Sequence, residues 1–300
     1  MGKASRTKQS VSRQQRVAAQ RAAAKRAEQR RRLLLGGGSV LVVLVVVAVF
    51  IIVKVTSGGS SNNSGTTSLS GSSLTKVVDK LASVPAATLE SVGGGSVDAK
   101  PQSTQGNPAV LMENGKPEML YVGALYCPYC GFERWGMIVA LSRFGTFTGL
   151  QTAQSSSTDY YPNTSTWSFV DAKYSSPYVS FSSVEEENRE EQALQKPTST
   201  ESALFDKYDA PPYVASADTG SYPFVDFGNQ YLVIGASYTP QVLSGLTWSQ
   251  IATDLQTPSN SVAKAVDGTA NYMTAALCKL TGDKPADVCT SSITSLQSGI

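Results

Sequence analysis

The pattern of apolar and polar positions begins with one long uncharged run, Leu33–Val53, of twenty-one residues. As a helix with a rise of about 1.5 Å per residue, this run would be ~31 Å long, close to the thickness of a bilayer's hydrocarbon core. Its second half consists almost entirely of aliphatic and β-branched side chains. We therefore predict a single transmembrane helix at residues 33–55.

A polar stretch rich in Ser, Gly and Asn follows at residues 56–73. Such a segment has too little apolar surface to pack, and it is predicted to be a flexible linker with a typical reach of roughly 20–25 Å. In residues 74–300 apolar positions recur with the spacing of helices and strands. This part is predicted to be one folded domain.

The first half of the domain contains segments with the periodicity of helices and segments with the periodicity of strands. Apolar residues recur three or four positions apart in residues 74–92, which predicts a helix. Asn114-Gly115 lies between two apolar runs and predicts a hairpin, and its second strand, Met119–Ala124, is apolar on both faces as in a central strand. An apolar helix is predicted from Phe132 to about Phe144.

The second half is predicted to contain one hairpin and several helices. The acidic run Glu185–Glu191 is predicted to belong to a helix whose charges lie in water. Thr198 and Glu201 have the spacing of a capping box that opens a short helix. The remaining predicted elements are strands at Tyr222–Phe227 and Tyr231–Gly235, helices at 247–255 and 259–280, and a short helix after Pro285.

Charge is distributed unevenly along the chain. Residues 1–32 contain eleven Lys and Arg residues and one acid, whereas the chain from Lys54 onward has a net charge of −8. Basic flanks stay on the cytoplasmic side, so we expect residues 1–32 to be a cytoplasmic tail and the domain to be extracytoplasmic. The alternative is a cleaved signal peptide, but its apolar region would have about 7–15 residues and no clear Ala-x-Ala site follows Val53.

The basic tail also raises the question of nucleic-acid binding. No aromatic residue is interleaved with its charges, and its composition favours a positive-inside signal that lies on anionic lipid. We expect no nucleic-acid partner and a membrane attachment through one N-terminal helix.

The four cysteines, Cys127, Cys130, Cys278 and Cys289, all lie in the predicted exported domain, where disulfides persist. The chain contains no histidine, which excludes His-based triads, Cys–His nucleophiles and His-ligated metals. The sequence holds no evidence for a small-molecule cofactor.

Cys127-Pro128-Tyr129-Cys130 lies where a predicted strand runs into a predicted helix. The N–H groups at the start of a helix favour a thiolate, the form that attacks disulfides, and Pro128 suits an early helix position because it has no N–H to lose there. The pattern favours thiol–disulfide exchange, with Cys127 attacking and Cys130 resolving. A zinc half-site and an inert Cys127–Cys130 disulfide are the alternatives, although zinc would need two more ligands.

Cys278 and Cys289 are predicted to form a structural disulfide, and we expect no metal site. Four cysteines allow three pairings, of which the local one is geometrically cheapest. A bridge over this loop would add on the order of 3 kcal/mol of stability in the loop-entropy account.

A strand, a Cys-x-x-Cys motif and a helix, followed much later by an X-Pro that opens a hairpin, resemble the thioredoxin superfamily. The resemblance rests on Cys127-Pro128-Tyr129-Cys130 and on Tyr222-Pro223. It implies an α/β, thioredoxin-like fold in which Pro223 is a cis proline facing the cysteine pair and Tyr222 offers backbone hydrogen bonds to a bound partner. A trans proline at the start of a strand is the alternative.

Parts of the chain also resemble particular branches of the thioredoxin superfamily. Residues 176–221 resemble the helical insertion of the DsbA-like branch, whereas Pro-Tyr between the cysteines is glutaredoxin-like. The segment Pro108–Cys289 is similar to a thioredoxin-like prokaryotic family catalogued only as a domain of unknown function, number nine-two-nine, and that name implies no activity.

Three departures from the better-known members affect the expected redox potential more than the reaction type. Tyr126 replaces the tryptophan common before the first cysteine of thioredoxins. No histidine lies between the cysteines, so the thiolate would depend on the helix terminus alone. The buried carboxylate that assists thioredoxin's second cysteine has no assigned counterpart, because helical geometry can direct the nearby Glu133 outward.

The leading hypothesis is a membrane-anchored, extracytoplasmic thiol–disulfide oxidoreductase. Pro128, Tyr129, Tyr222 and Pro223 would line the substrate groove, and the partners would be exported protein thiols or disulfides and a redox partner that recycles the pair. The alternative hypothesis is a thioredoxin-fold binding or scaffold module of the cell envelope with a structural, non-catalytic disulfide.

Overall fold

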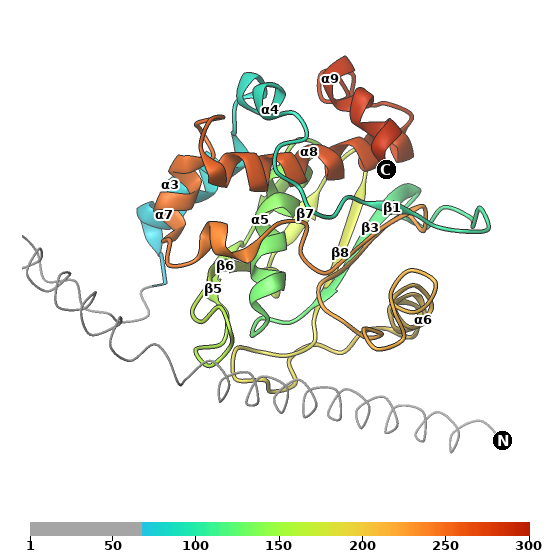
Figure 1. Cartoon of the computed structure of the whole chain (residues 1–300), viewed down its shortest axis with the longest axis horizontal. Coiled ribbons are helices and arrows are strands. Elements are labelled where there is room, and N and C mark those ends of the chain that lie inside the picture. The colour runs from blue at the N-terminus through green and yellow to red at the C-terminus, as the bar shows by residue number, and fades with distance from the viewer. Residues whose placement is uncertain (1–67) are drawn as a thin grey trace, which may run out of the picture. The chain divides into compact units, whose positions relative to one another are not determined.

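The computed structural model of the chain describes residues 68–300 (Figure 1). The predicted basic tail, the predicted transmembrane helix and most of the predicted linker lie outside the described residues. Across residues 68–300, no helix combines the length and the apolar character that crossing a membrane requires. The first described helix, α3 (Gly71–Ala82), begins within the predicted linker.

One mixed sheet carries the segment that contains the first two cysteines. Its strands are β1 (Gln102–Ser103), β2 (Met112–Glu113), β3 (Lys116–Gly123), β8 (Ser180–Glu185), β9 (Phe224–Phe227) and β10 (Tyr231–Ile234). β3 is central: it pairs in parallel with β8 and antiparallel with β9, and β10 and then β1 continue the sheet beyond β9. The mixed α/β class predicted from the sequence is confirmed.

Successive side chains of β3 enter two different clusters, because alternate residues of a strand point to opposite faces. Met119 and Tyr121 lie in the main hydrophobic cluster, with residues of α5 (Pro128–Ser142) and α8 (Ser261–Thr281). Leu120 and Val122 lie in a second cluster with residues of α6 (Ser199–Tyr208). Figure 1 shows α5 and α8 near one another and α6 apart from both. The central strand is therefore covered on both faces, as its apolar pattern predicts.

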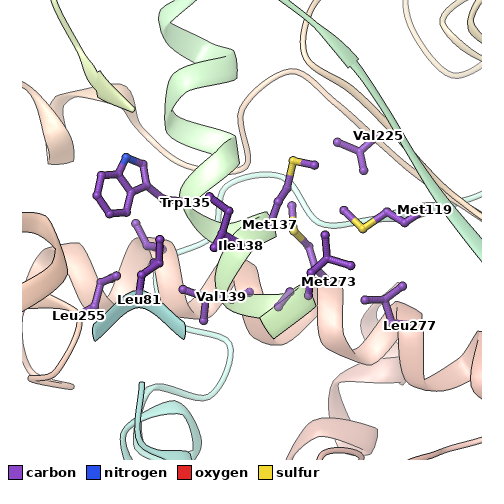
Figure 2. Packing of buried hydrophobic residues seen from close by; sticks show 14 of the residues in the cluster. Leu81, Met119, Trp135, Met137, Ile138, Val139, Val225, Leu255, Met273 and Leu277 are labelled. Carbon is purple, nitrogen blue, oxygen red and sulfur yellow. The ribbon is translucent and has the colours of Figure 1, made fainter. Parts of the chain in front are cut away.

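Helix α5 is buried along almost its whole length, with thirteen of its fifteen residues buried. In Figure 2 the sheet residues Met119 and Val225 and the α8 residues Met273 and Leu277 lie together on the Met137 side of the helix. Leu81 of α3 and Leu255, just after α7 (Trp248–Asp254), close the cluster on the side of Trp135. Packing on all sides fixes the position of the helix and of the cysteines at its start.

Several local predictions are confirmed. Asn114 and Gly115 have φ values of 51° and 75°, the left-handed values that a two-residue hairpin turn requires, and they join β2 to β3. Thr198 and Glu201 form both hydrogen bonds of a capping box at the start of α6. The hairpin of β9 and β10 and the helices α7 and α8 also lie where the pattern places them.

The prediction of a helical insertion at residues 176–221 is wrong. This segment contains β8, which pairs with the central strand, and only one helix, α6. The acidic run after β8 has a high helix propensity, but pairing with β3 holds Glu185 in the sheet and Glu191 adopts a φ of 61°. Tertiary pairing overrides local propensity here.

The predicted helix at residues 74–92 is interrupted. Pro85 has no N–H and stands at the N-cap of a separate helix, α4 (Ala86–Val92). The remaining short elements are β4 (Thr146–Thr148) paired with β7 (Lys173–Ser175), β5 (Gln151–Gln154) paired with β6 (Ser165–Ser168), η1 (Pro240–Leu243), α9 (Ser291–Thr294) and η2 (Ser295–Gly299).

Candidate active site

Cys127 and Cys130 lie at the junction between the end of β3 and the start of α5. Cys127 is the N-cap of α5, and its Sγ accepts a hydrogen bond from the backbone N–H of Cys130 at 3.3 Å. Pro128 occupies the first helical turn, where its missing N–H leaves no donor unpaired. Both cysteines are reduced, and the geometry places their sulfurs side by side within one turn.

The two thiols differ in their access to solvent. The Cys127 side chain is 7% exposed and that of Cys130 is 0% exposed. Tyr129, between them, is exposed and makes an edge contact with Tyr161 at 6.0 Å between ring centroids. An incoming reactant can therefore reach Cys127 more easily than Cys130.

Tyr222 and Pro223 come to this junction from the far end of the domain. The Tyr222–Pro223 peptide bond is cis, as expected. The Tyr222 carbonyl oxygen lies 4.0 Å from Cys127 Sγ, in position to accept from the thiol. The Tyr222 ring stacks on Phe205 of α6, and its hydroxyl donates to Glu186. Two residues predicted to share a site with Cys127 are thus brought beside it.

Two loops are tied to the backbone next to the cysteines. The Ser156 N–H donates to the Tyr126 carbonyl at 2.8 Å, and the Leu125 N–H donates to the Glu187 carbonyl at 2.9 Å. Arg189 connects the loops to each other by donating from Nε to the Ser155 carbonyl at 3.0 Å. The backbone just before Cys127 is consequently tied to both loops.

A buried ion pair lies close to Cys130. Arg134 Nε and Nη2 donate to the two carboxylate oxygens of Glu185 at 2.9 and 2.6 Å, and Nη2 also donates to the Ala124 carbonyl at 2.8 Å. Both side chains are 0% exposed. The Tyr121 hydroxyl donates to Glu185 Oε2 at 3.4 Å. The prediction that the charges of Glu185–Glu191 lie in water is therefore wrong for Glu185.

Arg134, Glu185 and Tyr121 also belong to this site and were not predicted from the sequence. One signal was available, since Arg134 follows Cys130 by four residues in a predominantly apolar helix, which places both on one face. The position of Glu185 depends on the parallel register that sets it opposite Gly123. That register is not visible in the local pattern.

The pKa shifts of the two thiols run opposite to the expectation. Burial and the hydrogen bond from its own thiol to Cys130 raise the pKa of Cys127 well above its usual value. Burial alone would raise the pKa of Cys130, but the Cys127 hydrogen bond and the Arg134 guanidinium outweigh it and lower that pKa. These pKa shifts favour a negative charge on Cys130, whereas the helix terminus was expected to favour a thiolate at Cys127.

Glu133 points inward, contrary to the suggestion that it can face outward. Its carboxylate accepts from the Ser237 N–H at 2.8 Å and from the Ser237 hydroxyl at 2.7 Å, and it is 0% exposed. Burial raises the pKa of Glu133 to about 7 in spite of these bonds. It is a buried carboxylate that links α5 to the segment before η1.

Two other buried carboxylates were not predicted. Burial raises the pKa of Asp226 to about 7 and that of Asp267 to about 8. Asp226 accepts from the Asn229 N–H at 2.6 Å, whereas neither oxygen of Asp267 has a hydrogen-bond partner within the described residues. Each carboxyl group can therefore hold a proton near neutral pH.

The second cysteine pair is a disulfide, as predicted. Cys278, near the end of α8, is bonded to Cys289, and their Cα atoms are 5.7 Å apart. The bridge closes the loop that leads to α9. Among residues 68–300, no group of three or more His, Cys, Asp or Glu side chains is arranged to hold a metal ion.

A family model described as "Domain of unknown function (DUF929)" matches residues 102–279. The matched segment runs from β1 into the last turns of α8, so it includes the whole sheet, α5 and the reduced cysteine pair. No curated protein and no solved structure matches the chain.

Proposed function

The chain belongs to the family described as domain of unknown function (DUF929), and from the site geometry we propose that it is a thiol–disulfide oxidoreductase acting on proteins. The observation that carries the proposal is the reduced Cys127–Cys130 pair at the start of α5, with the Cys130 N–H bonded to Cys127 Sγ at 3.3 Å. Two thiols in this geometry can interchange with one disulfide.

The arrangement around the pair supports the resemblance to the thioredoxin superfamily. The central strand β3 leads into Cys-x-x-Cys and α5, and Tyr222-Pro223 opens the hairpin of β9 and β10 beside Cys127. The carbonyl of Tyr222 faces the more accessible sulfur. In this proposal it helps to orient an extended partner segment, with Tyr129 and Pro128 contributing the adjacent surface.

The proposed location is the outer side of a membrane. The support is the sequence alone: a basic stretch in residues 1–32, the uncharged run Leu33–Val53 and an acidic domain after it. Protease added outside cells should digest the domain and leave the tail protected. Protection of the domain where the protease has access to the membrane surface would reject this placement.

The experiment for the reaction is an equilibration of the purified domain with glutathione buffers, followed by alkylation of free thiols without unfolding. We expect one two-electron transition of Cys127 and Cys130 with a potential between about −270 and −120 mV, the range of known exchange proteins. Cys278 and Cys289 should stay unmodified throughout, which makes them an internal control.

The low exposure of Cys127, 7%, favours a second candidate function, a binding or scaffold module of the cell envelope. A module of this kind would use the two loops beside Cys127 without chemistry at sulfur. The same experiment separates the two, because thiols that neither equilibrate nor react with alkylating reagent in the folded domain would favour the scaffold.

A further inference from the structure

The sulfur of Cys130 is surrounded by hydrogen-bond donors from three segments. The Ala124 backbone N–H donates to it, and the Cys127 thiol and the hydroxyl of Tyr121 on β3 can donate to it in place of the Tyr222 carbonyl and Glu185. Cys130 is 0% exposed, so these protein groups replace water entirely. A neutral thiol gains little from hydrogen-bond donors, whereas a thiolate is stabilised by each of them.

Close packing fixes the Tyr121 donor at this sulfur. A Cβ placed on Gly123 would lie 2.9 Å from Cys130 Sγ and would collide with the Tyr121 hydroxyl. Glycine at this position therefore leaves the space in which the hydroxyl and the sulfur meet. The Tyr121 ring is buried against Phe169, which restricts its rotation.

Arg134 supplies the positive charge near the same sulfur. Its two hydrogen bonds to Glu185 and the one to the Ala124 carbonyl lock the guanidinium in place. The remaining nitrogen, Nη1, is buried and has no hydrogen-bond partner within residues 68–300. Nη1 takes no part in the ion pair, so it can donate to negative charge that forms during a reaction.

The groups that face Cys130 come from four parts of the fold. They are Tyr121 from β3, Glu185 from β8, Arg134 from α5 and the Cys127 thiol at the N-cap. Glu185 opposes a thiolate, but both of its carboxylate oxygens already accept from Arg134. The donors therefore outnumber the one acidic group, and a low-dielectric interior strengthens each of them.

We propose that Arg134 and Tyr121 hold Cys130 as the leaving thiolate, so that the oxidised pair acts as a disulfide donor to protein dithiols. The inference rests on the proposed function and adds the direction of exchange. Arg134 and Tyr121 are positioning residues, because they act through the sulfur of Cys130 and do not touch the substrate.

The reaction balances with a protein dithiol as the reductant. A substrate thiolate attacks Cys127 Sγ of the Cys127–Cys130 disulfide; a bond forms from substrate sulfur to Cys127, and the intramolecular bond breaks with its electron pair going to Cys130. The second substrate thiol then loses its proton and attacks the mixed disulfide at the substrate sulfur. The substrate leaves with a disulfide, Cys127 takes up that proton, and the pair has gained two electrons.

The direction follows from leaving-group chemistry. A sulfur whose thiolate is stabilised leaves faster, and stabilising the reduced form of a pair makes it more oxidising. The accessible sulfur, Cys127, is the one attacked, and the buried sulfur, Cys130, is the one released. The fold thus stabilises the product of the first step.

The test measures the equilibrium constant of the pair with glutathione in matched variants. Tyr121→Phe removes one donor at Cys130, and we expect the constant to shift by about tenfold toward the protein disulfide, equal to about 30 mV for two electrons. Tyr238→Phe is the control, since it removes a buried hydroxyl that donates to the Phe132 carbonyl of α5. It should leave the constant within twofold of wild type.

A double variant removes the charges together. Arg134→Met with Glu185→Gln avoids leaving either charge unpaired, and it should shift the constant in the same direction as Tyr121→Phe. Unchanged constants in both variants, with a wild-type pair that equilibrates normally, would overturn the donor proposal while the oxidoreductase function stands. A wild-type pair that does not equilibrate at all would overturn both.

Single-cysteine variants keep the proposal testable if those variants do not fold. The ultraviolet absorbance of the thiolate is followed against pH in Cys127→Ser, which retains Cys130, and in Cys130→Ser, which retains Cys127. Cys130 should ionise at the lower pH. The reverse order would place the stabilised thiolate on Cys127 and contradict the proposal.

Discussion

The two cysteine pairs of this domain lie in opposite surroundings. Cys278 and Cys289 are bonded to each other and belong to the main hydrophobic cluster, near the end of α8. Cys127 and Cys130 are reduced at the start of α5, with hydrogen-bond donors and an ion pair around the inner sulfur. A disulfide gains nothing from buried donors, whereas a thiolate depends on them.

This difference separates a pair that stabilises the fold from a pair suited to chemistry. The spacing of two cysteines does not distinguish these roles, since a short loop can also hold an inert disulfide. The polar groups around each sulfur distinguish them. Variants that exchange or remove these features should affect activity and stability independently.

The largest expected effect is on exchange at Cys127. Cys127→Ser should lower the rate of disulfide transfer by at least about a thousandfold, because a serine hydroxyl does not ionise at neutral pH and cannot form the mixed disulfide. The measurement is the rate of disulfide formation in a reduced protein substrate. An active Cys127→Ser variant would show that the Cys127–Cys130 pair is not the reactive one.

The second prediction concerns the structural bridge. Replacing Cys278 and Cys289 together by Ser should lower the free energy of unfolding by on the order of 3 kcal/mol, because the reduced chain gains loop entropy when unfolded. Chemical denaturation measures this change, and the exchange rate of the folded variant should match wild type. Loss of exchange with the fold intact would mean that the second pair is part of the site.

The third prediction uses a buried carboxyl on the helix that carries Cys278. The pKa of Asp267 is about 8 against a usual 3.8, so the folded protein holds a proton that the unfolded chain has already lost. The contribution to stability is full below the unfolded pKa and is lost as pH rises through about 8. Wild type should therefore become less stable between about pH 4 and about pH 8.

Asp267→Asn removes this titration and should gain stability over wild type as pH rises, by about 4 kcal/mol between pH 4 and pH 7. The difference in unfolding free energy should grow with pH and level off above about pH 8. Exchange by Cys127 and Cys130 should not change. A constant difference across this range would show that Asp267 is ionised in the folded state.

The smallest expected effect is at the entrance to the reactive pair. Tyr129 is exposed, and Tyr129→Ala should raise KM for a protein substrate by roughly threefold, because one aromatic contact with the partner is lost. The free energy of unfolding should fall by no more than about 1 kcal/mol, because the edge contact with Tyr161 is also lost, and kcat should fall little. A large loss of kcat would instead indicate that Tyr129 orders the cysteines themselves.

Local pattern was sufficient to predict much of the fold. Asn114-Gly115 predicted the hairpin, the many apolar residues between Phe132 and Phe144 predicted the buried helix, and the spacing of Cys278 and Cys289 predicted their bridge. Each of these depends on residues that are near in sequence. The cis bond before Pro223 followed from a family resemblance and is present in the structure.

The polar half of the site could not be predicted in the same way. Glu185 reaches Arg134 only because β8 pairs in parallel with β3, in a register that sets Glu185 opposite Gly123. The acidic run that follows has the composition of a solvated helix, so local propensity pointed elsewhere. Long-range pairing of β8 with β3 therefore determines both that this segment is a strand and that Glu185 pairs with Arg134.

The measurement that tests the central claim most directly is covalent trapping of substrate proteins by Cys130→Ser. This variant, in its reduced form, keeps the accessible sulfur of Cys127 and lacks the thiol that releases a mixed disulfide. We expect protein adducts to accumulate with disulfide-bonded substrates, to disappear on reduction and to be absent in Cys127→Ser. Adducts that form in Cys127→Ser and not in Cys130→Ser would reverse the assigned roles, and adducts in neither would contradict the proposed function.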